Sequence, residues 1–309
     1  MRLPEVGSDI AQAETLPGWF YRSPEVLSAV RERVFARAHH LYAVASPSDP
    51  AVIPLELLPG LLGEPLVETR RGERRCLLSN VCTHRGALLV TEPHYRGTIR
   101  CPYHGRVFQL DGRLQRAPEF EAALDFPRES DHLRQVERNA WGPLCFASLD
   151  PARPFQQWFE PLRELFGFFE FEGCETRLRE YEIEASWMLY CDNYLEGFHI
   201  PFVHPALAKE VEWGSYETEL FANGSLQIAL AREGAAALDL PAGHAHHGKR
   251  VAALYAFLFP STIVNAYPWG LSINVLEPRD VERTVVRYIT VVKHPEKCDV
   301  GAVSDLDGV

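Results

Sequence analysis

The spacing of apolar residues near the N-terminus predicts a helix. Apolar side chains recur every three to four positions, with charged residues between them: Val26, Val30, Val34 and Phe35. Ser23 precedes Pro24, which places an N-capping hydroxyl and a proline at the first helical position. The pattern predicts an amphipathic helix over residues 24–38.

The pattern changes to short apolar runs between about residues 40 and 150. Runs with strand character are separated by turns rich in Gly, Pro and Asp-Gly, and the clearest are 66–70, 75–79, 98–100 and 107–110. Asp111-Gly112 follows the last run as a hairpin signal. Because no helical periodicity interrupts this stretch, it predicts a small all-β domain.

The remainder of the chain has a mixed pattern. It predicts helices over 154–168 and 186–199, and strands at 177–183, 217–221, 226–229, 252–259, 272–277 and 283–292. The whole chain is therefore expected to be α+β. We expect an N-terminal helical segment at 1–38, an all-β domain at 39–150 and a second domain at 151–309.

Composition narrows the class of protein. The chain has 309 residues and a net charge of −11, which does not suit binding to nucleic acid phosphates. The N-terminus lacks the apolar segment of a signal peptide, and the most apolar run, 251–259, is much shorter than the ~20 residues that cross a bilayer. These features predict a cytoplasmic protein without a membrane segment. In a reducing compartment, seven irregularly spaced Cys residues are expected to be metal ligands or core thiols.

Two short motifs each combine a Cys with a His. Cys82-Thr83-His84 is followed after sixteen residues by Cys101-Pro102-Tyr103-His104-Gly105, and both lie between predicted strands. Two thiolates and two imidazoles suit a tetrahedral Zn²⁺, which is one interpretation. A Rieske [2Fe–2S] cluster instead takes two thiolates on one iron and two imidazoles on the other, which two mixed Cys/His loops supply.

The two motifs resemble the cluster-binding loops of Rieske proteins. The resemblance implies that Cys82 and Cys101 bind one iron and that His84 and His104 bind the other. The additional loop cysteines of respiratory Rieske proteins are absent, which favours the branch found in oxygenases and their ferredoxins. One departure is Arg106, which stands where oxygenases often have Trp.

A second group of potential ligands occurs in the predicted helix 186–199. On an unbroken helix, Asp192, Glu196 and His199 share one face at positions i, i+4 and i+7, and Pro201 offers a kink that turns His204 back towards His199. Two imidazoles beside a carboxylate suit a mononuclear non-haem Fe(II) site. The alternative interpretation is that both histidines are ordinary interior or interface residues.

Together the motifs resemble the Rieske non-haem iron oxygenases. The resemblance implies an all-β Rieske domain inserted in a helix-grip (START-like) catalytic domain with an antiparallel sheet. It implies a terminal oxygenase that takes electrons from an NAD(P)H-dependent reductase or ferredoxin, activates O₂ at Fe(II) on His199 and His204, and hydroxylates or dealkylates a small organic substrate. It also implies a homotrimer in which Glu196, with Asp192 four positions earlier, links a Rieske His of one subunit to His199 of its neighbour. Glu rather than the usual Asp resembles the enzymes that act on quaternary ammonium compounds.

The third iron ligand of the family is a carboxylate about a hundred residues after the second His. Asp305 and Asp307 are the late candidates, and both stand in a Gly/Ser-rich tail, so we expect the ligand beyond Val309 or an incomplete iron site. An incomplete site favours an alternative function, that of a Rieske electron-transfer protein without catalysis. A zinc-stabilised binding module is the third interpretation.

Two further groups of residues have chemical potential. Three histidines lie close together, flanked by Gly and Ala, which predicts a loop: His244, His246 and His247. Clustered histidines can also bind a metal, and the resemblance to the oxygenase family implies that such a loop borders the substrate entrance. Several aromatic residues are expected to be mostly core, with a few facing a substrate as a cation–π cage for a quaternary amine: Trp187, Tyr190, Tyr194, Phe257, Tyr267 and Trp269.

Overall fold

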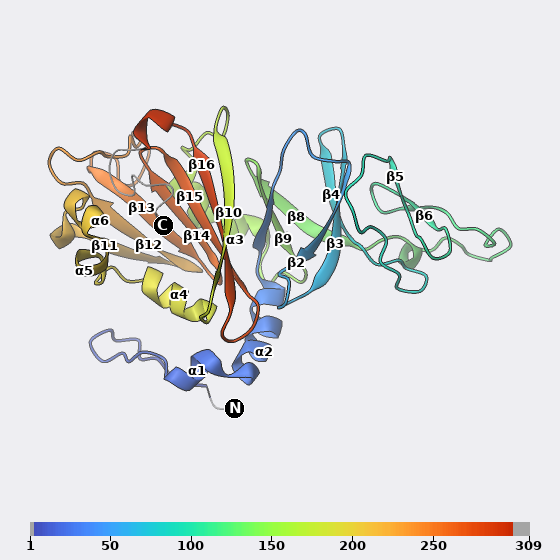
Figure 1. Ribbon diagram of the computed structural model, residues 1–309, viewed down its shortest axis with the longest axis horizontal. Helices are drawn as coiled ribbons and strands as arrows, with labels where there is room; N and C mark the ends of the chain where they lie inside the picture. The colour runs from blue at the N-terminus through green and yellow to red at the C-terminus, as the bar shows by residue number, and fades with distance from the viewer. Residues whose placement is uncertain (1–2, 299–309) are drawn as a thin grey trace. The chain divides into compact units, whose positions relative to one another are not determined.

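The computed structural model describes residues 3–298 and divides the chain into two compact units (Figure 1). One unit comprises Ala36–Ala152, and the other comprises the residues up to Phe35 together with those from Arg153 on. The second unit is thus interrupted in sequence by the first. Within residues 3–298, no helix has the length and apolar character needed to cross a bilayer.

The unit at 36–152 is built from β-strands, as the sequence predicts. A six-stranded sheet has the order β1-β9-β8-β4-β3-β2, and its strands are β1 (His40–Val44), β2 (Val52–Leu57), β3 (Glu64–Arg71), β4 (Arg74–Ser79), β8 (Gln135–Trp141) and β9 (Leu144–Ser148). A three-stranded sheet comprises β5 (Thr98–Arg100), β6 (Val107–Gln109) and β7 (Leu114–Arg116). The predicted hairpin at Asp111-Gly112 joins β6 to β7, and Gly112 has the positive φ of 88° that favours glycine in such a turn.

The other unit is dominated by a seven-stranded antiparallel sheet in the order β10-β16-β15-β14-β13-β12-β11. Its strands are β10 (Glu175–Ile183), β11 (Glu217–Phe221), β12 (Gly224–Leu230), β13 (Val251–Leu258), β14 (Thr262–Tyr267), β15 (Gly270–Pro278) and β16 (Thr284–Val292). The sequence pattern predicted all of these strands except β14. The α+β class and the antiparallel sheet are confirmed.

Six short α-helices, and a 3₁₀ turn that follows the second of them, surround or precede this sheet in the described chain. They are α1 (Gly18–Arg22), α2 (Pro24–Arg33), a 3₁₀ turn at Phe35–Arg37, α3 (Phe155–Phe166), α4 (Trp187–Tyr194), α5 (Ile200–Val203) and α6 (Pro205–Glu210). The helix predicted over 24–38 is therefore shorter, because it tightens into the 3₁₀ turn after Val34. The Ser23 hydroxyl caps α2 by accepting the Val26 amide N–H at 3.2 Å, as the sequence predicts.

The two faces of the large sheet differ in polarity. Gln227, Tyr255, Asn265 and Ser272 are directly paired across four neighbouring strands and share one face. The adjacent row, on the opposite face, is wholly apolar: Leu226, Ala256, Val264 and Ile273. All eight residues are buried. One face is therefore an ordinary core face, and the other is a buried face with hydroxyl and amide groups.

Helix α4 lies over the polar face of this sheet. The Tyr194 hydroxyl donates to Asn265 Oδ1 at 2.7 Å, and Gln227 Nε2 donates to the Tyr194 carbonyl at 2.7 Å. Asn274 Nδ2 on β15 donates to the Tyr190 hydroxyl at 2.9 Å. These bonds fix the position of α4, which leads directly into the segment that carries Glu196, His199 and His204.

Candidate functional site

The first Cys/His loop is a tight turn after β4. The Cys82 amide donates to the Ala87 carbonyl at 2.8 Å, and the Gly86 amide donates back to the Cys82 carbonyl at 3.0 Å. Gly86 has a φ of 67°, which a residue with a side chain adopts only with strain. The turn buries the Cys82 thiol and leaves the His84 ring partly exposed.

The second loop has the same hydrogen-bonding pattern. The Cys101 amide donates to the Arg106 carbonyl at 2.8 Å, the Gly105 amide donates to the Cys101 carbonyl at 3.2 Å, and Gly105 has a φ of 72°. Cys101 is buried and His104 is exposed. Two segments far apart in sequence thus adopt matched turns, each with a buried sulfur and a more accessible imidazole.

The two loops bring like groups together. Cys82 and Cys101 both belong to the hydrophobic core of the β-unit, where the Cys82 thiol donates to the Cys101 sulfur. The ring centroids of His84 and His104 are 4.8 Å apart at an interplanar angle of 62°. Sulfurs paired on one side and imidazoles paired on the other are the donor set that a Rieske cluster requires, so the residues fit this group.

Burial and hydrogen bonds act together on the pKa of each thiol. Burial raises the pKa of Cys82, and its hydrogen bond to Cys101 adds to that effect. Burial acts in the same direction on Cys101, but the amide N–H groups of His104 and Tyr103 and the Cys82 thiol donate to its sulfur, so the net pKa is lowered. Loop amides that point at a sulfur favour its thiolate form, which is the form that binds iron.

Arg106 connects the two loops. Its side chain is only 4 % exposed, and its Nη1 lies 3.2 Å from both Thr83 Oγ1 and Asp131 Oδ1. The guanidinium carbon stands 5.0 Å and 5.5 Å from the ring centroids of Phe120 and Phe126. At a position where oxygenases often have Trp, this chain thus has a buried and paired positive charge beside the loops.

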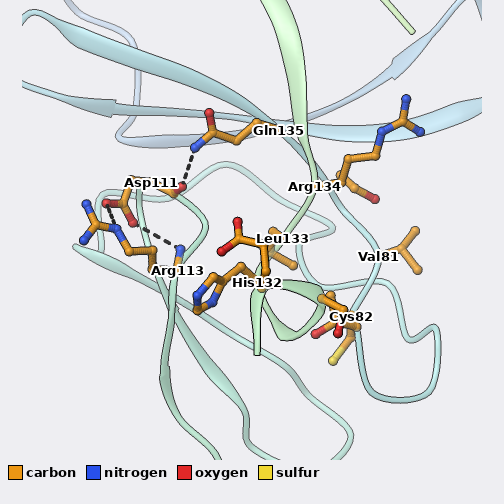
Figure 2. A pocket seen from close by; sticks show the side chains of 12 residues that line it. Val81, Cys82, Asp111, Arg113, His132, Leu133, Arg134 and Gln135 are labelled. Atoms are coloured by element: carbon orange, nitrogen blue, oxygen red, sulfur yellow. Dashed lines mark hydrogen bonds and ion pairs between the residues drawn. The ribbon is translucent and has the colours of Figure 1, made fainter. Parts of the chain in front are cut away.

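A cavity of about 870 Å³ lies on one side of the first loop (Figure 2). Its walls include Val81, Cys82 and Thr83 together with the segment 132–135. Figure 2 shows the Cys82 sulfur directed away from the other labelled side chains. At the opposite wall Arg113 Nε pairs with Asp111 Oδ2 at 2.9 Å. The cavity therefore approaches the backbone of the loop.

The second group of potential ligands follows α4, and here the predicted helix is wrong in its extent. The helix ends at Tyr194 instead of continuing to His199. Glu196 accounts for the break, because its carboxylate accepts the amide N–H groups of Phe198 and His199 and so competes with the helical pattern. Glu196, His199 and His204 are consequently arranged by a turn and by the start and end of α5, and not by one helix face.

The turn places Glu196 against an imidazole. Glu196 Oε1 lies 2.5 Å from His199 Nδ1. The ring centroids of His199 and His204 are 5.3 Å apart at an interplanar angle of 72°. A carboxylate that accepts the Nδ1–H of a histidine leaves Nε2 with its lone pair, which is the usual arrangement of a metal-binding histidine.

Asp192 is separated from this group. Its carboxylate accepts the Tyr21 hydroxyl of α1 at 2.5 Å, so it joins the N-terminal segment to α4. Burial and this hydrogen bond raise the pKa of Tyr21 to about 12. The expected shared face of Asp192, Glu196 and His199 is therefore not formed.

Within residues 3–298, no point brings three His, Cys, Asp or Glu residues around a single metal ion. A two-iron cluster needs no such group, since each iron takes two protein ligands and the bridging sulfides complete its shell. For a mononuclear iron, His199 and His204 are the candidate ligands in the described chain. Asp305 and Asp307 lie outside the described residues.

Two of the three clustered histidines are held by main-chain carbonyls. His244 Nε2 bonds the Leu165 carbonyl at 3.0 Å, and His247 Nδ1 bonds the Leu240 carbonyl at 2.7 Å. His244 and His246 are 9 % and 4 % exposed, so the loop expected at a substrate entrance is buried at these two positions. As expected, most of the aromatic candidates belong to the core: Trp187, Phe257, Tyr267 and Trp269 are all buried.

Comparison with known families gives a match for each of the two groups of residues. Residues 60–133 match the Rieske [2Fe-2S] domain, and residues 175–306 match the catalytic domain of the ring hydroxylating alpha subunit. The first match contains both Cys/His loops, and the second contains Glu196, His199 and His204.

Two curated relatives extend over most of the chain. Chloroplastic choline monooxygenase of Amaranthus tricolor is 30 % identical over 290 residues, covering 89 % of this chain and 63 % of the relative. The carnitine monooxygenase oxygenase subunit of Escherichia coli K12 is 28 % identical, covering 93 % and 77 %. The chain thus spans less than two thirds of the length of the plant relative.

Solved structures show the same fold. A quaternary ammonium Rieske monooxygenase has a TM-score of 0.73 at 24 % identity, covering 94 % of this chain and 80 % of that chain. Naphthalene 1,2-dioxygenase from Rhodococcus sp. has a TM-score of 0.72 at 19 % identity, covering 91 % and 74 %. The chain therefore joins a Rieske [2Fe–2S] domain to a catalytic domain of the ring hydroxylating alpha subunit family, a family that uses mononuclear iron.

Proposed function

We propose that the chain is the terminal oxygenase of a multicomponent system that oxidises a small organic substrate with O₂. The observation that carries the proposal is the presence, in one chain, of matched Cys/His loops and of a Glu196–His199 pair beside His204. The two groups suit two different iron cofactors, one for electron storage and one for O₂ chemistry.

In this proposal Cys82 and Cys101 hold one iron of the cluster, and His84 and His104 hold the other. The buried sulfurs and the more accessible imidazoles support this division. His199 and His204 hold the mononuclear iron. When bound, the cluster supplies one-electron transfer and the mononuclear iron supplies O₂ activation.

In this proposal Glu196 orients His199 and links it to a Rieske histidine of a neighbouring subunit. Its Oε1 keeps the Nδ1 proton of His199 in place, which orients the ring and fixes the tautomer. Its Oε2 accepts two backbone N–H groups of the same turn, so the carboxylate is itself fixed in position. Asp192 acts differently, since it anchors α4 to Tyr21 and has no contact with Glu196 among the bonds described above.

We further propose a quaternary ammonium substrate. The relatives named as choline and carnitine monooxygenases support this class, and so does Glu196 at a position where Asp is usual in the family. Helix α4 and the polar sheet face beneath it offer tyrosine rings, hydroxyls and amides, with Tyr194 on the helix and Tyr255 and Asn265 on the sheet. Neutral aromatic surfaces of this kind attract a cation without binding an anion.

The proposed assembly is a homotrimer that receives electrons from a separate NAD(P)H-dependent reductase or a ferredoxin. One related structure is described in terms of inter-subunit electron transfer, which supports a multimer. In such a trimer the exposed His104 or the partly exposed His84 of one subunit would approach Glu196 of its neighbour, whose side chain is 35 % exposed. Sedimentation equilibrium of the intact protein tests the trimer.

The function is tested by reconstitution. The purified protein is combined with a generic reductase and NADH, and O₂ uptake is measured with quaternary amines and, in parallel, with aromatic acids. We expect quaternary amines to stimulate O₂ uptake with matching loss of substrate. Uptake that only aromatic acids stimulate would contradict the substrate class while leaving the oxygenase assignment intact.

The variant His199→Ala separates the proposal from its rivals. An oxygenase keeps the electron paramagnetic resonance signal of its reduced cluster in this variant but loses product formation. A Rieske electron-transfer protein shows the same signal but forms no product, either as wild type or as the His199→Ala variant. A zinc-stabilised binding module shows no such signal at all.

A further inference from the structure

Arg106 follows the second cluster loop and has no part in the proposed function. It is a charged side chain placed in the core of the β-unit, with only 4 % of its surface exposed. Burying a guanidinium costs free energy unless it is paired, so its contacts indicate why the position is occupied by Arg. Four groups surround it: Thr83, Asp131, Phe120 and Phe126.

The polar contacts join three segments that are distant in sequence. Arg106 follows the second loop, Thr83 lies between Cys82 and His84 in the first loop, and Asp131 ends the 3₁₀ turn Glu129–Asp131. Arg106 Nη1 donates to Thr83 Oγ1 and Asp131 Oδ1, and Thr83 Oγ1 donates to the Asp131 carbonyl at 2.8 Å. The guanidinium therefore closes a triangle that holds the two loops in register.

The aromatic contacts extend this arrangement to an imidazole. The guanidinium stacks over Phe120 at 5.0 Å, and Phe120 meets the His84 ring edge-on, with centroids 5.8 Å apart. Phe120 in turn lies 4.9 Å from Phe126, which also contacts the guanidinium. The rings exclude water from the charge, and a charge in a medium of low dielectric constant acts more strongly on its neighbours than one in water.

One donor of the guanidinium is left over. Arg106 Nε is buried and has no hydrogen-bond acceptor among the described residues. A buried donor without a partner is unfavourable in the apoprotein. The sulfurs of a bound cluster are acceptors, so loading the loops with the cluster would bring acceptors to the region where this donor is buried.

We propose that Arg106 is a positioning residue with an electrostatic function. Its fixed positive charge raises the reduction potential of the cluster, and the negative charge of Asp131 limits the size of this increase. This inference rests on the proposed cluster site. Reduction adds one electron from a low-potential one-electron donor, breaks no covalent bond and lowers the charge of the bound group by one. A nearby positive charge favours the more negative state, and the carboxylate partly offsets it.

The test is a redox titration of the intact holoprotein at fixed pH, followed by electron paramagnetic resonance, for wild type and three variants. Arg106→Gln removes the charge, Arg106→Lys keeps it, and Asp131→Asn removes the counter-charge. We expect Arg106→Gln to lower the ratio of reduced to oxidised cluster at a given potential about tenfold, which is a shift of about 59 mV for one electron. Asp131→Asn should shift the potential upward, and Arg106→Lys should restore most of the wild-type value.

Arg113→Gln is the matched control. Arg113 is also an arginine paired with an aspartate near the first loop, since it pairs with Asp111 at 2.9 Å and lines the cavity beside Cys82, but its side chain is 67 % exposed. Its charge is screened by solvent, so this variant should leave the potential unchanged.

The outcomes separate the inference from the proposed function. Opposite shifts in Arg106→Gln and Asp131→Asn support it, since a mere loosening of the loops would move both variants the same way. An unchanged potential in both, with a normal cluster, overturns the role of Arg106 and leaves the proposed function standing. If Arg106→Gln assembles no cluster, Asp131→Asn and Arg106→Lys decide the question. A wild-type protein without sulfide contradicts the proposed function itself.

Discussion

At the scale of single residues, two acidic side chains close together in sequence have different partners. Glu196 turns back on its own segment and meets His199, whereas Asp192 reaches Tyr21, which lies far away in sequence. Chemical type and spacing do not distinguish the two carboxylates. Their hydrogen-bond partners do, and these partners place Glu196 at the proposed iron site and Asp192 in the packing of α1 on α4.

Replacing Glu196 by Ala is expected to weaken iron binding at the His199 and His204 site. Loss of a carboxylate that orients a metal-binding histidine typically costs 10- to 100-fold in metal affinity, and we expect about that loss here. Anaerobic titration with Fe(II) measures it. The matched control is Asp192→Asn, which should leave iron affinity unchanged, and equal losses in both variants would contradict the separate roles.

Tyr21 predicts a loss of stability in alkaline solution. Burial and the bond to Asp192 raise its pKa from an ordinary value of 10.0 to about 12 in the folded protein. The folded state then holds this proton more tightly than the unfolded state, so the contribution is fully present below pH 10 and disappears as the pH rises to about 12. Denaturant unfolding of Tyr21→Phe should show a smaller decline of stability over this range than wild type. An identical decline in both proteins would exclude the contribution.

At the scale of elements, the matched Cys/His turns depend on glycine at the same position. Gly86 and Gly105 each donate to the carbonyl of the cysteine four residues earlier and have φ values of 67° and 72°. The motif letters were sufficient to predict these loops, since the cysteine, the histidine and the glycine all lie within five consecutive residues.

Gly86→Ala is expected to destabilise the β-unit by about 1–2 kcal/mol, the cost of a left-handed backbone at a residue with a Cβ. Crowding does not contribute, because a Cβ at Gly86 would meet no atom within 4 Å. Gly97→Ala is the matched control, since that position also has open space but lacks the positive φ. Denaturant unfolding measures both variants. A Gly97→Ala variant as unstable as Gly86→Ala would show that backbone conformation is not the cause.

Other elements could not be predicted from local pattern. The spacing of Asp192, Glu196 and His199 suits a helix, but the Glu196 carboxylate binds backbone N–H groups and ends α4 early. Strand β14 was missed because Thr262–Tyr267 follows β13 after only a short turn, so the two strands merge into one apolar stretch. The surroundings of Arg106 depend on Asp131, a contact across 25 positions that no local pattern reveals.

At the scale of the whole molecule, the β-unit is inserted into the sequence of the unit that contains the large sheet. The β-unit begins at Ala36 and ends at Ala152, so the segment that contains α1 and α2 belongs to the unit of the large sheet. The Tyr21–Asp192 bond is one contact that makes this connection. Each unit carries one of the two proposed iron sites, and the chemistry therefore requires both units.

The most direct test of two different iron sites in one chain is the ratio of iron to acid-labile sulfide in the purified protein. Two different iron sites require about two sulfides per chain, with iron in excess of sulfide once Fe(II) is supplied. In the double variant His199→Ala/His204→Ala, the sulfide should stay unchanged and the iron should fall to match it. Zinc in place of iron, absence of sulfide, or an iron content that the double variant does not alter would contradict the presence of two different iron sites.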